Sequence, residues 1–336
     1  MRKILFLNTV HPILEERLTT LGFVCEYDIK ASKENIEGKI TDYFGVVIRS
    51  RFTIDKTFLD KATNLKFIAR SGAGLENIDV VYAEQKGIKV FNSPEGNRTA
   101  VGEHALGMLL MLFNQLKKGD AEVRKGIWDR EGNRGVEITG KTIAIIGYGN
   151  TGSAFAKKLS GFDCKVIAYD KYIKPLCHPE LVEGQTKRIN RWNNAERVDL
   201  LTIFQETDIL SIHLPLSDET HHYVNEAFLA RFKKPIYLIN TARGSNVCIA
   251  DLVEALKTNK VLGACLDVLE YETKSFETIN VENLPSDFKY LSQSDKVILS
   301  PHVAGWTQES YVKLSNFLAN KIEAAFVKKT VLKSKL

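Results

Sequence analysis

The chain of 336 residues lacks the cysteine spacing of a disulfide or zinc framework. Its five cysteines form no CxxC pair, and several stand in apolar runs, as Cys265 does between Ala264 and Leu266. Scattered thiols of this kind are typical of a reduced intracellular protein. We therefore expect a cytoplasmic protein with no disulfide and no metal site.

The chain also lacks long apolar runs and blocks of basic charge. No apolar run approaches the roughly 20 residues that span a bilayer, and the N-terminal stretch Ile4–Leu7 is too short for a signal peptide. The net charge is +5, and the 46 Lys and Arg residues are spread along the chain, with a mild cluster only near Lys328. These features predict neither a membrane nor a nucleic-acid partner.

What the chain does contain is an alternation of strand-like apolar runs with helical patterns. In the first hundred residues the expected strands are Ile4–Leu7, Gly45–Ile48, Leu65–Ala69 and Lys89–Phe91. The helical patterns between them are Pro12–Leu21, Thr57–Ala62 and Val80–Lys86. This alternation predicts a parallel sheet covered by helices on both faces.

A long helical pattern at Thr99–Lys118 precedes a second series of the same kind. It is apolar on more than one face, which is typical of a helix buried between domains or subunits. The strands expected after it are Ile143–Ile146, Lys165–Tyr169, Ile209–His213, Ile236–Ile239, Gly263–Asp267 and Val297–Leu299, and a last amphipathic helix covers about Glu309–Lys328. Two such series, without a Pro/Gly-rich linker or a solenoid repeat, predict two α/β domains joined by continuous elements.

One segment, Lys174–Asn193, fits neither series. It has no clean periodicity and falls between two elements of the second series. We interpret it as a surface insertion, with a regulatory loop as the alternative. Cys177 and His178 within it have no nearby partners at metal-ligand spacing.

The most specific motif is GYGNTG, in the second series. Its residues are Gly147, Tyr148, Gly149, Asn150, Thr151 and Gly152. It follows the apolar strand Thr142–Ile146 and opens a helical pattern, and the next strand ends in Asp170, 18 residues after Gly152. This is the full context of a dinucleotide-binding fingerprint; a glycine-rich turn without function is the alternative.

Each part of the motif has a physical reason. Gly147 permits the tight turn, Gly149 lets backbone amides approach a pyrophosphate at the helix N-terminus, and Gly152 lets helix and strand pack closely. Asp170 is expected to accept hydrogen bonds from the adenosine ribose and to repel a 2′-phosphate. The cofactor is therefore expected to be NAD rather than NADP, although the adjacent Lys171 acts in the opposite direction.

Three charged residues follow three predicted strands, where open α/β sheets bind ligands. Reduction of a 2-keto acid needs a cation that binds the carboxylate and polarises the carbonyl, and Arg243 can do both. It also needs a proton donor near neutral pH, which we assign to His302, and a carboxylate that orients the donor, which we assign to Glu272. Singly, each residue could be structural, and Glu270 is an alternative to Glu272.

Further motifs accompany these residues along the chain. They are Val47–Ser50, Ser71–Asp79, Val101–His104, His213–Leu216, Asn240–Gly244, Leu266–Val268 and Ser300–His302. In order and combination they resemble the D-isomer-specific 2-hydroxyacid dehydrogenase family, which includes D-3-phosphoglycerate dehydrogenases. The resemblance covers nearly the whole chain outside Lys174–Asn193. The chain departs from the family at Thr273, where Pro is usual after the glutamate, and this keeps Glu270 open as the alternative.

The resemblance implies roles for named residues. The catalytic trio is Arg243, Glu272 and His302. Asp267 holds the nicotinamide carboxamide, and the cofactor cleft is lined by His213, Pro215, Thr241 and Ala242. The substrate carboxylate is received by Arg49 and by backbone amides near Ser71, Gly72, Ala73 and Gly74.

The resemblance also implies the architecture. A Rossmann-type NAD-binding domain, residues 99–304, is inserted into a flavodoxin-like substrate domain, residues 1–98 and 305–336, and both are doubly wound parallel sheets. Hinges are expected near Gly96–Thr99 and Ala304–Thr307, with closure excluding water from the reaction. The long helix from Thr99 is expected to contribute to a homodimer.

The arginines of the first series bear on the substrate. Arg49 and Arg51 are expected to point the same way, and Arg70 and Arg98 flank predicted substrate-side loops. Several cations favour an acid with a second anionic group, such as 3-phosphoglycerate. Because such cations can also be solvated or paired, hydroxypyruvate, glyoxylate and D-lactate remain alternatives. Two other classes stay open: an NAD(H)-binding scaffold similar to co-repressors, and a paralogue inactivated by the insertion.

Overall fold

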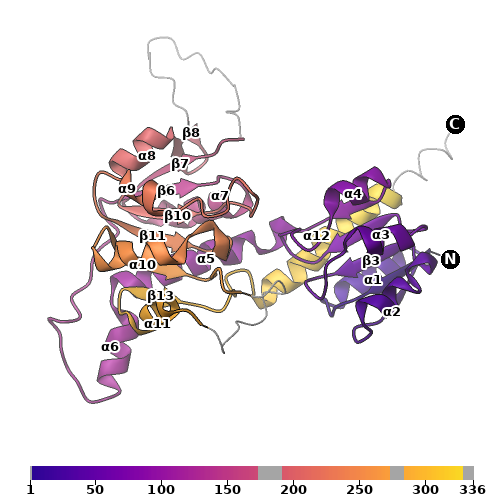
Figure 1. Ribbon diagram of the computed structural model, residues 1–336, viewed down its shortest axis with the longest axis horizontal. Helices are drawn as coiled ribbons and strands as arrows, with labels where there is room; N and C mark the ends of the chain where they lie inside the picture. The colour runs from indigo at the N-terminus through magenta and orange to yellow at the C-terminus, as the bar shows by residue number, and fades with distance from the viewer. Residues whose placement is uncertain (1, 173–190, 273–283, 328–336) are drawn as a thin grey trace, which may run out of the picture. The chain divides into compact units, whose positions relative to one another are not determined.

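The computed structural model describes residues 2–172, 191–272 and 284–327. They form two compact units (Figure 1). The terminal unit is built from the described residues of Met1–Arg98 and Trp306–Leu336. The central unit is built from those of Thr99–Glu272 and Ile279–Gly305. Both are α/β units with parallel sheets, as the sequence predicts.

The terminal unit has a five-stranded, wholly parallel sheet. Its strands are β1 (Arg2–Phe6), β2 (Phe23–Tyr27), β3 (Gly45–Ile48), β4 (Phe67–Arg70) and β5 (Lys89–Phe91). Their order, β2-β1-β3-β4-β5, is that of a flavodoxin-like sheet. The sequence patterns miss β2, because this edge strand is only partly buried and carries Glu26 among its apolar residues.

Helices cover both faces of this sheet, so its strands are apolar on both sides. Ile4 and Phe6 pack towards α1 (Ile13–Thr20) and α12 (Gln308–Phe326). Leu5 and Leu7 pack towards the opposite set of helices, which are α2 (Lys33–Glu37), α3 (Lys56–Lys61) and α4 (Val80–Gln85). The last described helix of the chain therefore completes the fold of the first hundred residues.

The central unit has an eight-stranded sheet. Its strands are β6 (Thr142–Ile146), β7 (Lys165–Tyr169), β8 (Arg191–Trp192), β9 (Ala195–Arg197), β10 (Ile209–Ile212), β11 (Ile236–Asn240), β12 (Val261–Leu266) and β13 (Val297–Leu299). The order is β13-β12-β11-β10-β6-β7-β9-β8, parallel except for β8, which pairs antiparallel with β9. Reversal of the strand order at β6 gives the Rossmann arrangement. The sequence patterns miss β8 and β9, which are too short to show a period.

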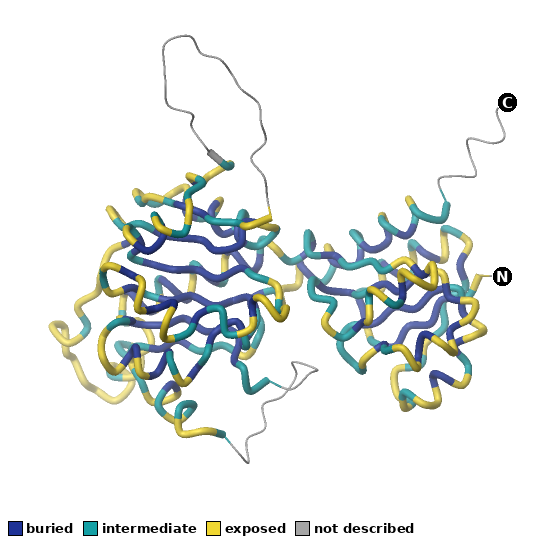
Figure 2. Tube along the Cα trace, turned by 45° about the horizontal axis from the view of Figure 1, so that its top comes forward, coloured by how far each residue is buried: buried dark blue, intermediate teal, exposed yellow. Residues whose placement is uncertain are grey.

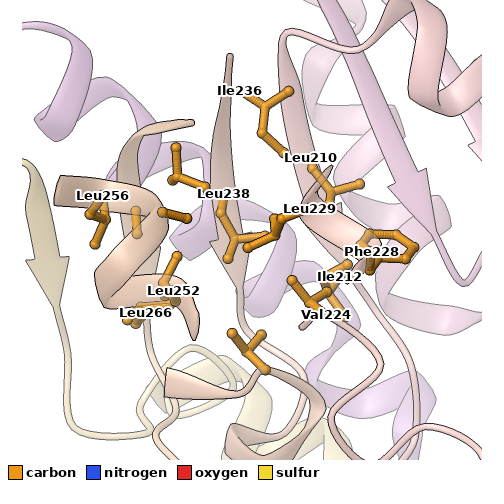
Figure 3. Close-up of a cluster of buried hydrophobic side chains, with 14 of the residues drawn as sticks. Leu210, Ile212, Val224, Phe228, Leu229, Ile236, Leu238, Leu252, Leu256 and Leu266 are labelled. Carbon is orange, nitrogen blue, oxygen red and sulfur yellow. The ribbon is translucent and has the colours of Figure 1, made fainter. Parts of the chain in front are cut away.

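The two faces of the central sheet have separate cores. On one face the strands pack against α8 (Leu200–Glu206), α9 (Glu226–Ala230), α10 (Ile249–Lys257) and α11 (Ser286–Gln293). Figure 3 shows part of this core, with Leu210 and Leu238 of the strands beside Phe228 and Leu252 of the helices. On the other face the strands pack against α5 (Pro94–Phe113) and α7 (Asn150–Lys158). The inner strands of the sheet are buried along most of their length (Figure 2).

The expected single helix at Thr99–Lys118 is wrong in its bounds. Its first part is α5, which begins at Pro94, where the fixed φ of proline suits the first helical position. The helix ends at Phe113, and a second helix, α6 (Leu116–Val123), follows Gln115, whose φ of +52° is left-handed. Short 3-10 turns occur at Ile40–Asp42, Leu159–Gly161 and Gly244–Asn246. Of the helices in the described part of the chain, none combines the length and hydrophobicity of a membrane span.

Candidate active site

The glycine motif forms the turn between β6 and α7. Gly147 has a φ of +90°, and a Cβ there would lie 2.5 Å from the carbonyl oxygen of His213. A Cβ on Gly152 would lie 2.1 Å from the carbonyl oxygen of Gly147, so both positions require glycine. At Gly149, the N-cap of α7, a Cβ would meet no atom within 4 Å. The helix N-terminus is therefore bordered by open space, as a phosphate site requires.

The side chain of Tyr148 contacts the hairpin formed by β8 and β9. Its ring stacks on Trp192 with centroids 4.5 Å apart, and its hydroxyl donates to the backbone carbonyl of Asn193. Burial raises the pKa of Tyr148 to about 12. Tyr148 thus anchors the β8–β9 hairpin to the glycine motif. Apart from the hairpin, the predicted insertion Lys174–Asn193 lies outside the described residues.

Asp170 follows β7 and contacts the glycine motif. Its carboxylate accepts hydrogen bonds from the backbone amides of Tyr148 at 2.8 Å and Tyr172 at 2.9 Å. The neighbouring Lys171 forms an ion pair with Glu219, which also accepts from the Tyr172 hydroxyl. This hydrogen bond to Glu219 raises the pKa of Lys171. The cation beside Asp170 is therefore engaged by a carboxylate from the loop after β10.

His213 connects β10 to α7. Its Nε2 lies 2.9 Å from Ser211 Oγ and its Nδ1 lies 3.2 Å from Thr151 Oγ1. The side chain is buried, and burial lowers the pKa of His213 to about 3. The ring is therefore neutral over the physiological range and holds the first turn of α7 against the sheet. Pro215, two residues on, accepts from Thr220 Oγ1 at 2.6 Å through its carbonyl oxygen.

The segments that follow β11, β12 and β13 lie side by side. Asn240 pairs with Leu266 and Leu266 pairs with Leu299, so the three strands end at one level. Beyond the strands, His302 donates its backbone N–H to the carbonyl oxygen of Asp267 at 2.7 Å. The predicted catalytic residues therefore emerge from one edge of the central sheet.

The imidazole of His302 is hydrogen-bonded to Glu272. Its Nδ1 lies 2.6 Å from Glu272 Oε2, and Glu272 Oε1 accepts from the backbone amide of Leu269 at 2.6 Å. The carboxylate is thus fixed at both oxygens and directs the imidazole. Glu270, the alternative, lies elsewhere: its Oε2 is 2.8 Å from His222 Nε2, and its Oε1 accepts from the Ile249 amide at the start of α10.

Arg243 is held in the loop after β11. Its Nη1 donates to the Ala242 carbonyl at 2.7 Å, and its backbone N–H donates to Asn246 Oδ1 at 3.1 Å. A Cβ on Gly244 would lie 2.0 Å from the carbonyl carbon of Leu269. The loop that carries Arg243 is therefore packed against the loop that leads to Glu272.

The other predicted cofactor residues of this edge are buried. Thr241 Oγ1 has no hydrogen-bond partner among the described residues, which is uncommon for a buried hydroxyl and fits a polar group on a bound cofactor. Asp267 is 2% exposed, and its Oδ1 accepts from Ser300 Oγ at 2.6 Å. Burial alone would raise the pKa of Asp267, but hydrogen bonds from His104, Ser300 and backbone amides outweigh burial and lower it.

The predicted substrate loop, Ser71–Gly74, follows β4 in the terminal unit. Backbone hydrogen bonds fix it: Ser71 N donates to Ile48 O, and Ser93 N donates to Gly72 O, each at 2.9 Å. The guanidinium of Arg70 lies against Gly72, because a Cβ there would be 1.5 Å from Arg70 Nη1. The loop therefore presents backbone next to a cation.

The arginines of the terminal unit do not act together as expected. The Arg49 guanidinium lies over the Trp306 ring, 4.2 Å from its centroid. Arg51 instead donates to backbone carbonyls, to Leu7 at 3.1 Å and to Asp28 at 2.5 Å. The two groups engage different segments, so the expectation that they point the same way is wrong, and Arg51 has a structural role.

Metal ligation has no support in the part of the chain that the structure describes. No group of three or more His, Cys, Asp or Glu side chains there is arranged to hold a metal ion. The four described cysteines are free, and Cys265 is fully buried.

A family model for the NAD-binding domain of D-isomer-specific 2-hydroxyacid dehydrogenases matches residues 106–304. The chain belongs to this family. The match covers the glycine motif, the predicted catalytic trio and every described strand of the central sheet. The central unit is therefore the NAD-binding domain of a 2-hydroxyacid dehydrogenase.

Relatives of the chain within the 2-hydroxyacid dehydrogenases carry several names. It is 35% identical over 324 residues to a glyoxylate reductase of Thermofilum pendens, covering 91% of this chain and 87% of that protein. It is 31% identical over 314 residues to a D-3-phosphoglycerate dehydrogenase of Archaeoglobus fulgidus, covering 93% of this chain but 55% of that protein. The chain thus spans about half the length of that relative.

A solved structure shows the same fold over the whole length. The D-lactate dehydrogenase of Aquifex aeolicus, complexed with NAD and lactic acid, is 27% identical with a TM-score of 0.78. The match covers 98% of this chain and 96% of that one. The two-sheet architecture is thus that of solved 2-hydroxyacid dehydrogenases.

Some residues of this dehydrogenase site were not predicted to take part. Ser300 and His104 lie in the motifs that resemble the family, but their link to Asp267 is between residues far apart in the chain. Glu219, the partner of Lys171, follows the His213–Leu216 motif without any pattern of its own. No sequence feature of these residues predicts their partners.

Proposed function

We propose that the protein transfers a hydride between NAD and C2 of a small D-2-hydroxy acid or the corresponding 2-keto acid. The observation that carries this proposal is the His302–Glu272 pair, with Nδ1 and Oε2 2.6 Å apart. His302 follows β13 and Glu272 follows β12, which lies beside β11, the strand that leads to Arg243, at the carboxyl edge of a Rossmann sheet. A proton donor, its orienting carboxylate and a substrate cation are the groups that this reaction requires.

Three residues of the chain have separate roles in this reaction. Arg243 binds the keto-acid carboxylate and polarises the carbonyl that becomes the hydroxyl. A nicotinamide held at this edge of the sheet would supply a hydride, with its two electrons, for C2. His302 gives the proton at Nε2 to the carbonyl oxygen, and Glu272 accepts from Nδ1–H and stabilises the imidazolium before transfer. In the oxidative direction His302 takes up the same proton.

The cofactor would be held along one edge of the central sheet. The backbone of Gly147–Gly152 would bind the pyrophosphate at the open N-terminus of α7, and Asp170 would bind the adenosine ribose. Thr241 would use its buried hydroxyl, which has no partner among the described residues. Asp267 would face the nicotinamide carboxamide. Because Lys171 is paired with Glu219, we propose NAD rather than NADP.

We assign substrate recognition to a domain of residues 1–98 and 305–336, and cofactor binding to residues 99–304. Arg49 and the backbone near Ser71–Gly74 would receive the substrate carboxylate, with hinges near Gly96–Thr99 and Ala304–Thr307. Arg70, packed against Gly72, supports an acid with a second anionic group. We therefore propose 3-phosphoglycerate as the first candidate substrate. Hydroxypyruvate, glyoxylate and D-lactate are the alternatives, because Arg51 donates to backbone carbonyls and so removes one of the cations expected near a second anionic group.

We also propose a homodimer, formed through α6 and the segment after it. This part of the central unit extends away from the sheet (Figure 1). It exposes large apolar side chains, which are Leu116, Val123, Ile127, Trp128 and Val136, and Trp128 is 80% exposed. A stretch of exposed apolar groups of this kind is typical of an interaction surface, and a second copy is the simplest partner for a self-complementary one.

The proposal is tested by oxidation of NADH against a panel of 2-keto acids. The panel is 3-phosphohydroxypyruvate, hydroxypyruvate, glyoxylate, pyruvate and 2-oxoglutarate, each repeated with NADPH. Turnover of one acid with NADH supports the reaction and identifies the substrate. Measurable NADH binding without turnover of any of them would contradict it and favour an NAD(H)-binding scaffold or an inactive paralogue.

A further inference from the structure

His104, on α5, is joined to the segment of His302 by a chain of hydrogen bonds. Its Nε2 lies 2.8 Å from Ser300 Oγ and 3.5 Å from Asp267 Oδ1. Ser300 Oγ lies 2.6 Å from Asp267 Oδ1, and Asp267 is almost fully buried. Buried polar networks are favourable only when their members are satisfied, so they fix a specific geometry.

The direction of each hydrogen bond follows from chemistry. Hydrogen bonds lower the pKa of Asp267 in spite of its burial, so this side chain is a carboxylate that only accepts. Ser300 therefore gives its single hydroxyl hydrogen to Asp267. His104 Nε2 must then carry a hydrogen and donate it to Ser300 Oγ, which defines its tautomer.

Asp267, the last member of this hydrogen-bonded series, binds the backbone at and after His302. Asp267 Oδ1 accepts from the amide of Val303 and Oδ2 accepts from the amide of Ala304, each at 2.9 Å. The backbone oxygen of Asp267 accepts from His302 N at 2.7 Å. One residue therefore binds three consecutive amides.

The backbone that Asp267 binds has an unusual conformation at His302. His302 has a φ of +54°, in the left-handed region that side chains other than glycine seldom adopt. Such a conformation persists only when the surrounding structure imposes it. The amides on either side of the His302 carbonyl are those that Asp267 holds.

We propose that His104 is a positioning residue for the proton donor. Through Ser300 and Asp267 it fixes the left-handed backbone of His302, so that Nδ1 faces Glu272. His104 does not itself touch the reacting atoms. The inference rests on the proposed role of His302 as the proton donor. It assigns α5, which carries His104, a part in positioning that donor.

The experiment compares His104→Leu, which removes the donor, with His104→Gln, whose side-chain amide can still donate to Ser300. We measure kcat and the Kd of NADH, the latter by fluorescence titration. His104→Leu should lower kcat roughly tenfold to a hundredfold, as expected for a displaced catalytic group, with a clearly smaller loss of NADH affinity, because Asp267 is also assigned to the cofactor. His104→Gln should recover most of the loss, and Ser300→Ala should reproduce it.

The deciding step repeats His104→Leu in a His302→Ala background. If His104 acts through His302, it should have no further effect on kcat beyond about twofold in that background. An undiminished effect there, or a loss confined to NADH binding or thermal stability, would overturn the inference. If His302→Ala alone leaves kcat unchanged, the proposed function fails, and that failure is separately visible.

Discussion

Two histidines of the central unit form similar pairs with glutamate. His302 pairs with Glu272 at 2.6 Å, and His222 pairs with Glu270 at 2.8 Å. Only the first pair follows β13, on the edge shared with the Arg243 loop, while Glu270 also binds the Ile249 amide at the start of α10. The second pair therefore provides a matched control for the first.

Replacement of His302 by Ala should lower kcat by about two to four orders of magnitude, the range for loss of a general acid. NADH binding should stay within about twofold of wild type, because the side chain acts on the substrate. His222→Ala should leave kcat within about threefold. Loss of NADH binding in His302→Ala, measured by fluorescence titration, would instead show a structural role.

Replacement of Asp170 by Ala should weaken NADH binding more than NADPH binding. The carboxylate is expected to accept from the ribose hydroxyls of NADH and to repel a 2′-phosphate, and its removal takes away both effects. The measurement is the Kd of each cofactor for wild type, Asp170→Ala and the exposed control Asp163→Ala. Equal weakening of both cofactors in Asp170→Ala would contradict a ribose contact.

At the scale of elements, His213 couples the end of β10 to the first turn of α7. The neutral ring bridges Ser211 and Thr151, and the carbonyl oxygen of the same residue lies 2.5 Å from where a Cβ on Gly147 would be. One buried residue thus contacts the strand, the turn and the helix. Its burial links the packing of these elements to pH.

The folded pKa of His213, about 3, is lower than its ordinary value of 6.5. Between these values the unfolded chain binds a proton at His213 that the folded protein does not bind. The stability that comes from burying the neutral imidazole is therefore complete above pH 6.5 and decreases as the pH falls towards 3. In His213→Gln, the free energy of unfolding should depend less steeply on pH between 6.5 and 4. Urea unfolding at several pH values measures this, and an unchanged pH dependence would contradict it.

At the scale of the whole molecule, the homodimer depends on α6 and the segment after it. The double variant Ile127→Ser/Trp128→Ser removes two exposed apolar side chains without touching the core. Loss of this apolar contact should convert the dimer to a monomer in light scattering at micromolar concentration. Leu201→Ser, on an exposed position of α8, is the control and should stay dimeric. A wild-type monomer would contradict the proposed interface.

The sequence alone was sufficient where interacting residues belong to one local unit. The β6 strand, the glycine motif, α7 and the β7 strand ending in Asp170 follow one another, and their order carries the dinucleotide fold. The strands buried on both faces are continuous apolar runs, which is why most were predicted within one or two residues. Edge elements such as β2 and the β8–β9 hairpin lacked this burial and were missed.

The tertiary structure decided what depends on contacts between distant residues. Glu270 and Glu272 are two positions apart, and only the loop after β12 determines which of them faces His302. His104 and Ser300, separated by 196 positions, meet because α5 packs on the face of the sheet near β13. Arg51 donates to backbone carbonyls of two other segments, and no local pattern around Arg49 and Arg51 indicates these contacts. Residue types and local spacing therefore determined the family and the chemistry, whereas strand order and register determined which groups meet.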